Sequence, residues 1–278
     1  MGISRSLTSA RGELVEPRAM RPPRAAENVE PVMRALARAI DGLELPAVEK
    51  ISESQEEDPF QVLIATALSA RTQDATTLAA STRLFNVART PATMARLTVK
   101  RIERLIYPVS FYRHKARHVK AACRILVERF GGRVPTTLEE LLTLPGVGRK
   151  TANLVLILAF KSLEHISVDT HVHRISNRLG WVSTRTPEQT EQALYDATGA
   201  RWWPYINLYL VTWGQNVCRP VYPRCGECVI RPFCPQVGVN AGPNDARLTS
   251  GEKARPAYVG RTLSGPPGIK AAPKKAAI

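Results

Sequence analysis

The sequence predicts an all-α fold, because apolar residues recur at helical spacing and no useful length of chain alternates with period two. Hydrophobic residues make up 44% of the 278 residues, which is enough to bury a sizeable core. Turn residues such as Gly131-Gly132 and Pro145-Gly146 separate the apolar stretches from one another. We therefore expect short helices joined by tight turns.

The predicted helices follow one another between residues 31 and 213. The stretch 60–68 is apolar on nearly every side, which is typical of a helix buried in a core. The remaining helices are predicted from the spacing of their apolar residues. They span residues 31–40, 75–85, 94–106, 115–130, 138–144, 149–160, 170–179, 188–197 and 206–213.

Both ends of the chain lack this periodicity. Residues 1–28 mix Arg, Pro, Ser and Glu, which is typical of a disordered leader. Residues 236–278 are rich in Gly, Pro, Ala and Lys, and we expect a flexible basic tail with loose affinity for phosphate. The sequence has neither a long apolar run nor the apolar centre of a signal peptide, so we expect no membrane partner and a cytoplasmic location.

The positive charge lies mainly in the predicted folded region. The formal net charge is +15, and residues 31–235 contribute +9 of it. A basic folded body is typical of proteins that bind a polyanion such as nucleic acid. A soluble basic protein without a nucleic-acid partner is the alternative that charge alone leaves open.

Four of the five cysteines lie close together after the last predicted helix. Cys218, Cys225, Cys228 and Cys234 form the pattern C-x6-C-x2-C-x5-C. In a reducing cytoplasm such a group more often binds metal than forms disulfides. Four thiolates suit an iron–sulfur cluster or tetrahedral zinc, although zinc sites more often contain two close cysteine pairs. Cys123 lies inside an apolar helical pattern and is interpreted as a core residue.

Residues 137–160 predict two helices joined by a turn that contains two glycines. These glycines let the backbone turn tightly and leave its amides uncovered by side chains. The second helix begins at the turn, so its free N–H groups and the positive end of its dipole face the same way. We expect Gly146, Val147, Gly148 and Arg149 to bind a DNA phosphate without regard to sequence. An ordinary helical hairpin is the alternative.

Lys150 and Asp169 are the candidate catalytic pair. Lys150 lies in the first turn of a helix, where a cation opposes the dipole at a cost of roughly 0.3–1 kcal/mol. We expect the helix end, Arg149 and desolvation to favour the neutral, nucleophilic amine, although a solvated surface lysine is the alternative. Asp169 is placed to cap the next helix, and its carboxylate would also stabilise positive charge at a sugar C1′.

The segment L-P-G-V-G-R-K-T-A-N, followed by V-D-T-H-V-H-R, resembles the endonuclease III branch of the helix–hairpin–helix superfamily of DNA glycosylases. The resemblance covers about residues 31–235 and includes the cysteine spacing. It implies that Lys150 is the nucleophile and Asp169 the catalytic aspartate. It also implies a [4Fe–4S] cluster. The implied ligands are Cys218, Cys225, Cys228 and Cys234.

The resemblance also implies contacts with DNA. Arg219 and Arg224 lie between the first two cysteines, where the family approaches the DNA backbone; a solvated loop is the alternative. Arg71 replaces the glutamine that fills the space left by the flipped nucleotide, which makes the lesion preference uncertain. Phe111 matches the wedge between bases, with core packing as the alternative. Further DNA-contact candidates in the V-D-T-H-V-H-R segment are His171 and Arg174.

The architecture implied by the resemblance is two helical domains with the DNA site in the cleft between them. A six-helix barrel would cover residues 52–163 and contain the helix–hairpin–helix at about 137–160. The cluster domain would combine residues 29–51 with residues 164–235. The chain would therefore cross between the domains twice.

The function implied by the resemblance is base excision repair. A monomer would excise oxidised pyrimidines from damaged double-stranded DNA and cleave 3′ to the abasic site by β-elimination through a lysine Schiff base. One alternative is a thymine or uracil mismatch glycosylase of the same superfamily, which Arg71 keeps open. A second alternative, from another class, is a non-catalytic DNA-binding protein.

Overall fold

The computed structural model describes residues 25–54 and 58–239, and all regular structure within these ranges is helical. The all-α prediction is confirmed. No helix in these two ranges is long and apolar enough to cross a membrane. The first described helix begins at Ala25, so the predicted boundary of the disordered leader, at residue 28, lies four residues too far along the chain. The rest of the leader and all but the first four residues of the predicted tail lie outside the described residues.

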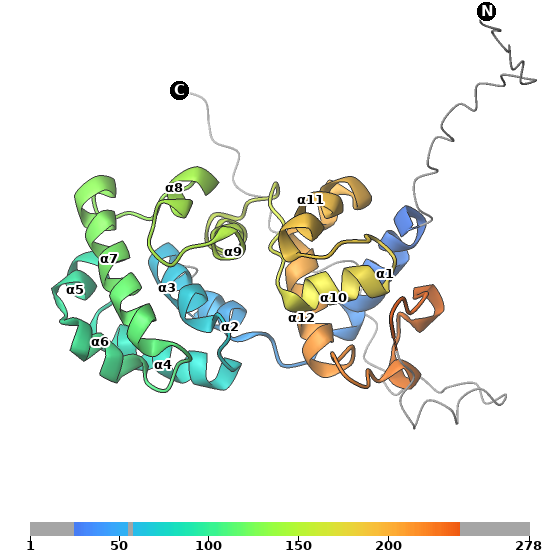
Figure 1. Cartoon of the computed structure of the whole chain (residues 1–278), viewed down its shortest axis with the longest axis horizontal. Helices are drawn as coiled ribbons and strands as arrows, with labels where there is room; N and C mark the ends of the chain where they lie inside the picture. Colours follow the sequence, from blue (N-terminus) through green and yellow to red (C-terminus); the bar gives the residue numbers. More distant parts are fainter. Residues whose placement is uncertain (1–24, 55–57, 240–278) are drawn as a thin grey trace, which may run out of the picture.

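Two hydrophobic cores divide the described chain into two units that lie side by side (Figure 1). We call the first the hairpin unit, residues 47–160. Its helices are α2 (Ala47–Ser54), α3 (Pro59–Ser69), α4 (Asp74–Val87), α5 (Pro91–Arg96), α6 (Val99–Ile106), α7 (Tyr112–Phe130), α8 (Leu138–Leu142) and α9 (Arg149–Phe160).

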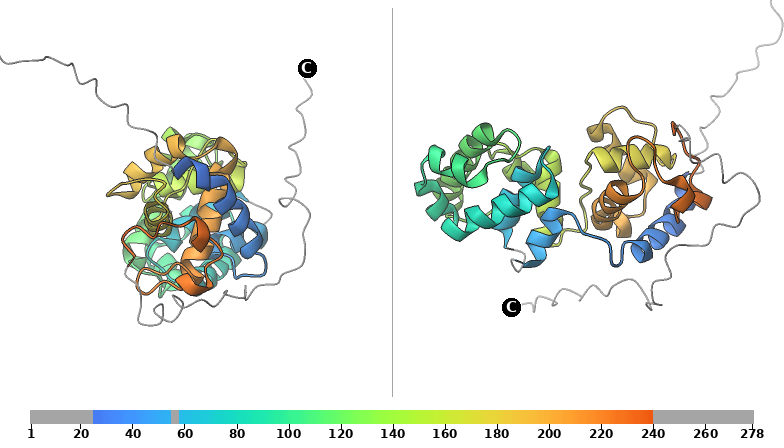
Figure 2. Two further views of the ribbon diagram at one scale, coloured as in Figure 1. Left: turned by 90° about the vertical axis from the view of Figure 1, so that its right-hand side faces the viewer. Right: turned by 90° about the horizontal axis from the view of Figure 1, so that it is seen from below.

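The second unit, which we call the cysteine unit, joins the start of the described chain to its end. It consists of residues 25–43 and 166–239. Its α-helices are α1 (Ala25–Ala39), α10 (Thr170–Arg178), α11 (Pro187–Ala197) and α12 (Trp203–Asn216), with short 3-10 turns at Ala200–Trp202, Cys225–Glu227 and Arg231–Phe233. The chain passes between the units before α2 and again after α9 (Figure 2).

Helix α3 lies at the centre of the hairpin unit. Its residues from Phe60 to Leu68 are buried almost without exception, as the sequence predicts for a helix that is apolar on all sides. Asp58 caps its first turn by accepting a hydrogen bond from the Gln61 amide at 2.8 Å. Because α3 packs against α2, α4, α7 and α9, it fixes the start of α9, where Lys150 lies.

Two details of the hairpin unit differ from the sequence prediction. The expected single helix over 94–106 is wrong: α5 and α6 are separate, and the Thr98 hydroxyl begins α6 by accepting a hydrogen bond from the Arg101 amide at 3.1 Å. Helix α2 was not predicted. It packs against α3, α4 and α9, so the expected domain boundary between residues 51 and 52 falls inside a helix of the hairpin unit.

Helix α1 closes the cysteine unit. The Asn28 side chain accepts a hydrogen bond from the Trp181 indole at 2.9 Å and donates one to the Phe233 carbonyl at 2.8 Å. Glu30 accepts a hydrogen bond from the Trp202 indole at 2.7 Å. Helix α1 is therefore held by residues that lie far from it in the sequence, at Trp181, Trp202 and Phe233.

Candidate active site and DNA interface

The turn between α8 and α9 exposes backbone amides at a helix N-terminus. Gly146 has φ +81°, and a Cβ on it would lie 2.9 Å from the His118 ring and Cβ. Gly148 is the N-cap of α9 and offers no side chain to the first-turn N–H groups. Within the described chain the Gly146 and Gly148 amides have no hydrogen-bond partner. These donors and the helix dipole form an anion site.

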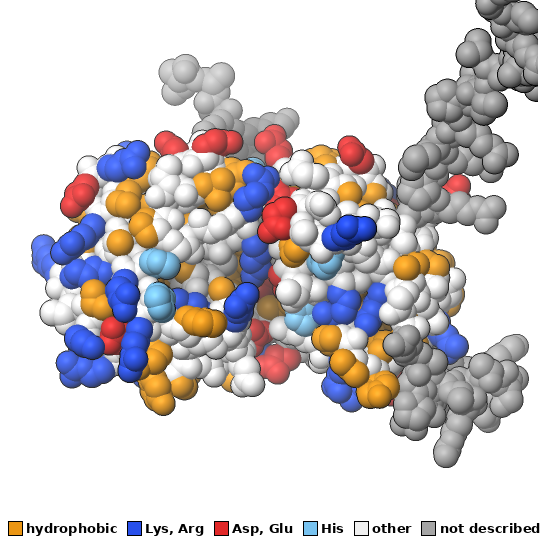
Figure 3. All heavy atoms as spheres, in the orientation of Figure 1, with side chains coloured by type: hydrophobic (Ala, Val, Ile, Leu, Met, Phe, Trp, Pro, Cys, Tyr) orange, Lys and Arg blue, Asp and Glu red, His pale blue; other side chains and the backbone are white. Residues whose placement is uncertain are grey.

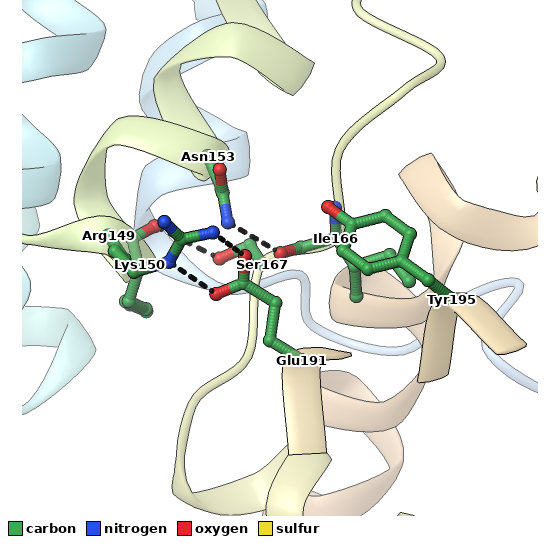
Figure 4. Close-up of polar contacts among 7 residues, drawn as sticks. All are labelled: Arg149, Lys150, Asn153, Ile166, Ser167, Glu191 and Tyr195. Atoms are coloured by element: carbon green, nitrogen blue, oxygen red, sulfur yellow. Dashed lines mark hydrogen bonds and ion pairs between the residues drawn. The ribbon is translucent and has the colours of Figure 1, made fainter. Parts of the chain in front are cut away.

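Val147 and Arg149 differ from the other predicted phosphate contacts. The Val147 amide already donates to the Leu144 carbonyl at 3.1 Å, and its side chain is 9% exposed within the core. Arg149 donates to the Glu191 carboxylate at 2.7 and 3.3 Å, which raises the pKa of the guanidinium (Figure 4). Val147 therefore shapes the turn, and Arg149, which the sequence predicts as a cation beside Lys150, is paired with Glu191.

The segment between α9 and α10 is fixed by four hydrogen bonds, and Figure 4 shows the residues around Lys150 that take part. The buried Asn153 side chain donates to the Ile166 carbonyl at 2.8 Å, and the Tyr195 hydroxyl accepts from the Ile166 amide at 3.1 Å. The Ser167 hydroxyl donates to the Lys150 carbonyl at 3.1 Å. On the other side, Asn207 donates to the Ser167 carbonyl at 2.9 Å. The sequence analysis missed these residues, although a buried Asn in an apolar helix is an available signal.

Asp169 is the N-cap of α10, as predicted. One oxygen of its carboxylate accepts hydrogen bonds from the His171 amide at 2.8 Å and the Val172 amide at 2.9 Å. The cap therefore fixes the Asp169 side chain at the end of the segment that leads from Lys150.

Two further carboxyl groups lie in the same region. Glu49, on α2, is only 5% exposed, and burial raises its pKa to about 7, with Lys150 lowering it and Asp74 and Asp169 raising it. The charges of Lys150, Asp74 and Asp169 therefore all act on the pKa of the Glu49 carboxyl group. Asp74 accepts hydrogen bonds from the Ala47 amide and the Gln215 side chain, both at 3.1 Å. It thereby joins the hairpin unit to α12.

His171 and Arg174 pack against α12. Arg174 donates to the Cys218 carbonyl at 2.8 Å, to the Gly214 carbonyl at 3.3 Å and to the His171 ring nitrogen Nδ1 at 3.1 Å. Burial lowers the pKa of His171. Both residues were predicted as DNA contacts, but the structure gives Arg174 a network of internal partners that fixes α10 beside the first cysteine.

Arg71 and Phe111 lie together although they come from different loops. The Arg71 guanidinium carbon is 6.0 Å from the centre of the Phe111 ring, and both side chains are exposed. Both residues have a left-handed backbone, with φ 55° and 57°. Non-glycine residues rarely adopt this conformation, and they do so mostly at functional loops.

Lys115 fixes the positions of these two loops relative to each other. Its ammonium donates to the carbonyls of Leu68 and Ala70 at 2.7 and 2.6 Å, and to the Thr72 hydroxyl at 3.2 Å. The Ser110 amide also donates to the Thr72 hydroxyl at 3.2 Å. The sequence analysis gave Lys115 no role. The structure makes it the residue that positions the Arg71 loop against the Phe111 loop.

All four predicted metal ligands line one cavity. Its walls also contain apolar side chains of α10 and of the cysteine segment; the four ligands are Cys218, Cys225, Cys228 and Cys234. Burial raises the pKa of Cys228 to about 11, so a bound cation would be needed to hold it as a thiolate at neutral pH. Within the described chain, no three His, Cys, Asp or Glu side chains are grouped to hold a single metal ion.

Arg178 fixes the loop that carries the first cysteine. Its buried guanidinium donates to the Cys218 sulfur at 3.3 Å and to the carbonyls of Arg219 and Pro220 at 2.7 and 2.8 Å. The Arg219 side chain itself is exposed. Arg224 is also exposed and lies 3.9 Å from Glu227. The two predicted phosphate contacts of this loop are thus accessible from solvent.

Basic side chains are frequent on the face of the molecule that Figure 3 shows. The space-filling view shows a furrow between the two units, with basic and acidic side chains inside it. A polyanion on this face would therefore meet the positive charge that the composition indicated.

Comparison with known proteins gives consistent matches. Residues 64–198 match the family described as "HhH-GPD superfamily base excision DNA repair protein". Endonuclease III of Thermotoga maritima is 52% identical over 180 residues, which cover 65% of this chain and 84% of the relative. Endonuclease III of Escherichia coli is 39% identical, with 63% and 83% covered. The chain covers only 53% of endonuclease III homolog 2 of Arabidopsis thaliana, at 43% identity.

Solved structures of similar fold include a trapped endonuclease III–DNA covalent intermediate. It matches with a TM-score of 0.67 and 30% identity over 76% of this chain and 96% of that chain. A thermostable thymine-DNA glycosylase matches with a TM-score of 0.65 over 77% of this chain and 98% of that chain. At 22% identity the second match indicates a common fold only.

Proposed function

Because the chain belongs to the endonuclease III family of the HhH-GPD superfamily, we propose that it excises oxidised pyrimidines from duplex DNA and cleaves the abasic site. The comparisons support the predicted enzyme class, a DNA glycosylase and abasic-site lyase of base excision repair. The choice of lesion, the site residues and their roles are part of the proposal. So are the monomeric state and the cytoplasmic location.

The observation that carries the mechanism is the linkage between Lys150 and Asp169. Lys150 is the second residue of α9, and Ser167, two residues before Asp169, donates to its backbone carbonyl. The Lys150 amine attacks C1′ and the bond to the damaged base breaks. The capped Asp169 carboxylate stabilises the positive charge that develops on the sugar. The resulting Schiff base acidifies the 2′ protons, and β-elimination cleaves the strand on the 3′ side.

Extrusion of the damaged base precedes this chemistry. Unstacking costs a few kcal/mol, and less for a damaged base, so the cost itself favours lesions. The free amides around Gly146 and Gly148 would bind the backbone phosphate. Phe111 would enter the stack, while the neighbouring Arg71 fills the gap or contacts the base left without a partner.

The mismatch alternative rests on Arg71 alone. A guanidinium at this position alters which opposing bases fit beside the space left by the flipped nucleotide. The presence of Lys150 nevertheless indicates an enzyme that also cleaves the abasic site. The structural match to a thymine-DNA glycosylase does not favour the alternative, since it indicates only the fold. A non-catalytic binder is disfavoured because both catalytic positions are filled.

A [4Fe–4S] cluster is the proposed cofactor of the cysteine unit. The four thiols line a common cavity, and their spacing contains one close cysteine pair, whereas zinc sites more often contain two. The buried Trp213 indole N–H has no hydrogen-bond partner within the described chain, so it is available to donate to a cluster sulfur or a cysteine thiolate. When bound, the cluster would supply structural cross-linking of the cysteine segment, and no step of the reaction is assigned to it.

The nucleophile can be tested by trapping. Borohydride added while the protein acts on abasic-site DNA should reduce the Schiff base and give a covalent protein–DNA adduct. Lys150→Ala should give no adduct and no strand cleavage. Equal trapping by the wild type and Lys150→Ala would refute the assignment of the nucleophile, and binding without cleavage by the wild type would favour the non-catalytic alternative.

The lesion preference can be tested with a panel of duplexes. Thymine glycol and dihydrouracil should be excised faster than uracil opposite guanine, and adenine opposite 8-oxoguanine should not be excised. Faster release of uracil or thymine from mismatches would favour the alternative. Arg71→Gln should shift these relative rates without changing the cleavage of a preformed abasic site.

The cofactor can be tested on purified protein. An iron–sulfur protein should be yellow-brown and contain iron and sulfide in equal amounts, whereas a colourless preparation with one zinc per chain would refute the cluster. Cys228→Ser should lower the iron content. The matched control is Cys123→Ser, because Cys123 is buried in the hairpin unit, away from the cavity.

A further inference from the structure

Glu49 is a buried carboxyl group that the proposed mechanism does not yet use. It lies in the first turn of α2, where an acidic residue ordinarily interacts with the helix dipole from the surface. Glu49 is instead 5% exposed, and no salt bridge among the described residues includes it. A hydrogen bond from its own backbone amide lowers the pKa of Glu49, but burial outweighs it and raises the pKa, so the dipole alone does not account for its position.

Helix α2, which carries Glu49, packs beside the helices that carry Lys150 and Asp74. Asp74 is the first residue of α4, and Lys150 is the second residue of α9. The Asp74 carboxylate receives the Ala47 amide at 3.1 Å, so the first turn of α2 is fixed against α4. Gln215 of α12 binds the same oxygen, which ties this arrangement to the other unit.

The charges around Glu49 make its protonation depend on Lys150. Burial raises its pKa to about 7; Lys150 lowers this pKa, while Asp74 and Asp169 raise it. Loss of the positive charge at Lys150 therefore makes Glu49 bind a proton more tightly, and formation of a charged Schiff base has the opposite effect. A group with these properties at neutral pH is suited to take up and return a proton.

We propose that Glu49 exchanges a proton with the Lys150 nitrogen and with the sugar ring oxygen during Schiff-base formation. The inference rests on the proposed function. After Lys150 Nζ has bonded to C1′ and the base has left with its electron pair, taking a proton from water, the nitrogen carries two protons and a positive charge. One N–H bond breaks, the electron pair stays on nitrogen, and the proton goes to a Glu49 carboxylate oxygen.

The same proton then completes ring opening. As the nitrogen lone pair forms the C1′=N bond, the C1′–O4′ bond breaks and its electron pair passes to O4′. Glu49 returns its proton to O4′, which becomes a hydroxyl group, and the carboxylate is regenerated beside the positively charged Schiff base. No further co-reactant is needed, and Asp169, held by its two amide donors, takes no part in this proton exchange.

The test is Glu49→Gln, which keeps the size of the side chain and removes its proton exchange. The readout is single-turnover borohydride trapping on a duplex that contains an oxidised pyrimidine, as a function of pH. The wild-type rate should rise through a midpoint near pH 7, because the acceptor must be ionised. Glu49→Gln should be slower by about 100-fold at neutral pH and should lose this midpoint.

Two controls separate proton exchange from a structural effect. Glu53→Gln removes an exposed carboxyl group from the same helix and should keep both the rate and the pH profile. Affinity of Glu49→Gln for a duplex with an uncleavable abasic analogue should equal that of the wild type. If Glu49→Gln fails to fold, Glu49→Asp takes its place and should keep a pH midpoint at reduced rate.

The outcomes distinguish this inference from the proposed function. Cleavage and trapping by the wild type, together with an unchanged rate and pH profile in Glu49→Gln, would refute the role of Glu49 alone. An unchanged rate in Glu49→Asp with no midpoint would do the same. Absence of trapping by the wild type would instead refute the proposed function.

Discussion

Glu49 lies where water cannot solvate its charge, and this has a consequence for stability as well as for catalysis. Its pKa is about 7 in the folded protein and about 4.5 in an unfolded chain. Between these values the folded state binds more protons than the unfolded state, so the free energy of unfolding falls as pH rises. The carboxylate therefore destabilises the protein most at pH 7 and above, where the enzyme would work.

Glu49→Gln should accordingly stabilise the protein in alkaline solution. The expected gain is up to about 3 kcal/mol at pH 8, and it should disappear near pH 4, where Glu49 is protonated in both states. Thermal unfolding of the two proteins at several pH values measures the difference. A variant that is less stable than the wild type at pH 8 would contradict the burial of an unpaired carboxyl group; Glu53→Gln is the control.

Local sequence identified the catalytic pair but not the residues that surround it. Lys150 could be found because it follows a glycine turn at a helix start, and Asp169 because its position predicts an N-cap. Both are local features. Glu49 and Asp74 acquire their roles only when α2 packs against α9 and α4, which no local pattern predicts. The pairing of Arg149 with Glu191 was missed for the same reason.

The hairpin turn is the element in which backbone conformation matters most. Gly146 combines a left-handed backbone with close contact to His118 of α7. Gly146→Ala should lower the free energy of unfolding by about 2 kcal/mol, through backbone strain and the clash, and should weaken binding of abasic-site DNA. Denaturant unfolding and DNA titration measure the two effects.

The matched control is Gly132→Ala. Gly132 has a similar backbone, with φ +77°, but an added Cβ would meet nothing within 4 Å. It should show the strain without the clash, and DNA binding should not change. Equal losses of stability in the two variants would mean that the contact with His118 is unimportant, and Gly146→Ala/His118→Ala should recover part of the loss.

A helix was predicted correctly where its own sequence carries a strong signal, and it was missed where the helix depends on its neighbours. Helix α3 was found because its residues are apolar on all sides, whereas α2 was missed because its short, polar sequence A-V-E-K-I-S-E-S depends on neighbours for stability. The break between α5 and α6 was missed because apolar spacing continues across it. The signal was Thr98, whose side chain caps α6.

At the scale of the whole molecule, the two units are joined by polar contacts as well as by the chain. Arg149 at the start of α9 pairs with Glu191 of α11, which is 4% exposed in its side chain. Asp74 and Gln215 form a second contact between the units. The position of Lys150 relative to Asp169 therefore depends on both units together.

Arg149→Ala should destabilise this junction by about 3 kcal/mol, because it leaves the Glu191 carboxylate buried without a partner. Arg149→Ala/Glu191→Gln should be more stable than Arg149→Ala alone, since the second change removes the uncompensated charge. Unfolding temperatures of the wild type, both single variants and the double variant measure the coupling. Additive effects would show that the ion pair contributes nothing of its own.

The arrangement of α1 determines the order in which the protein can be completed on the ribosome. The hairpin unit uses a continuous stretch of chain and can fold as soon as residue 160 has left the exit tunnel. Helix α1 emerges earlier, but Trp181, Trp202 and Phe233, which bind it, are synthesised after the hairpin unit. Its apolar face therefore remains exposed to chaperones and proteases until these residues have left the ribosome.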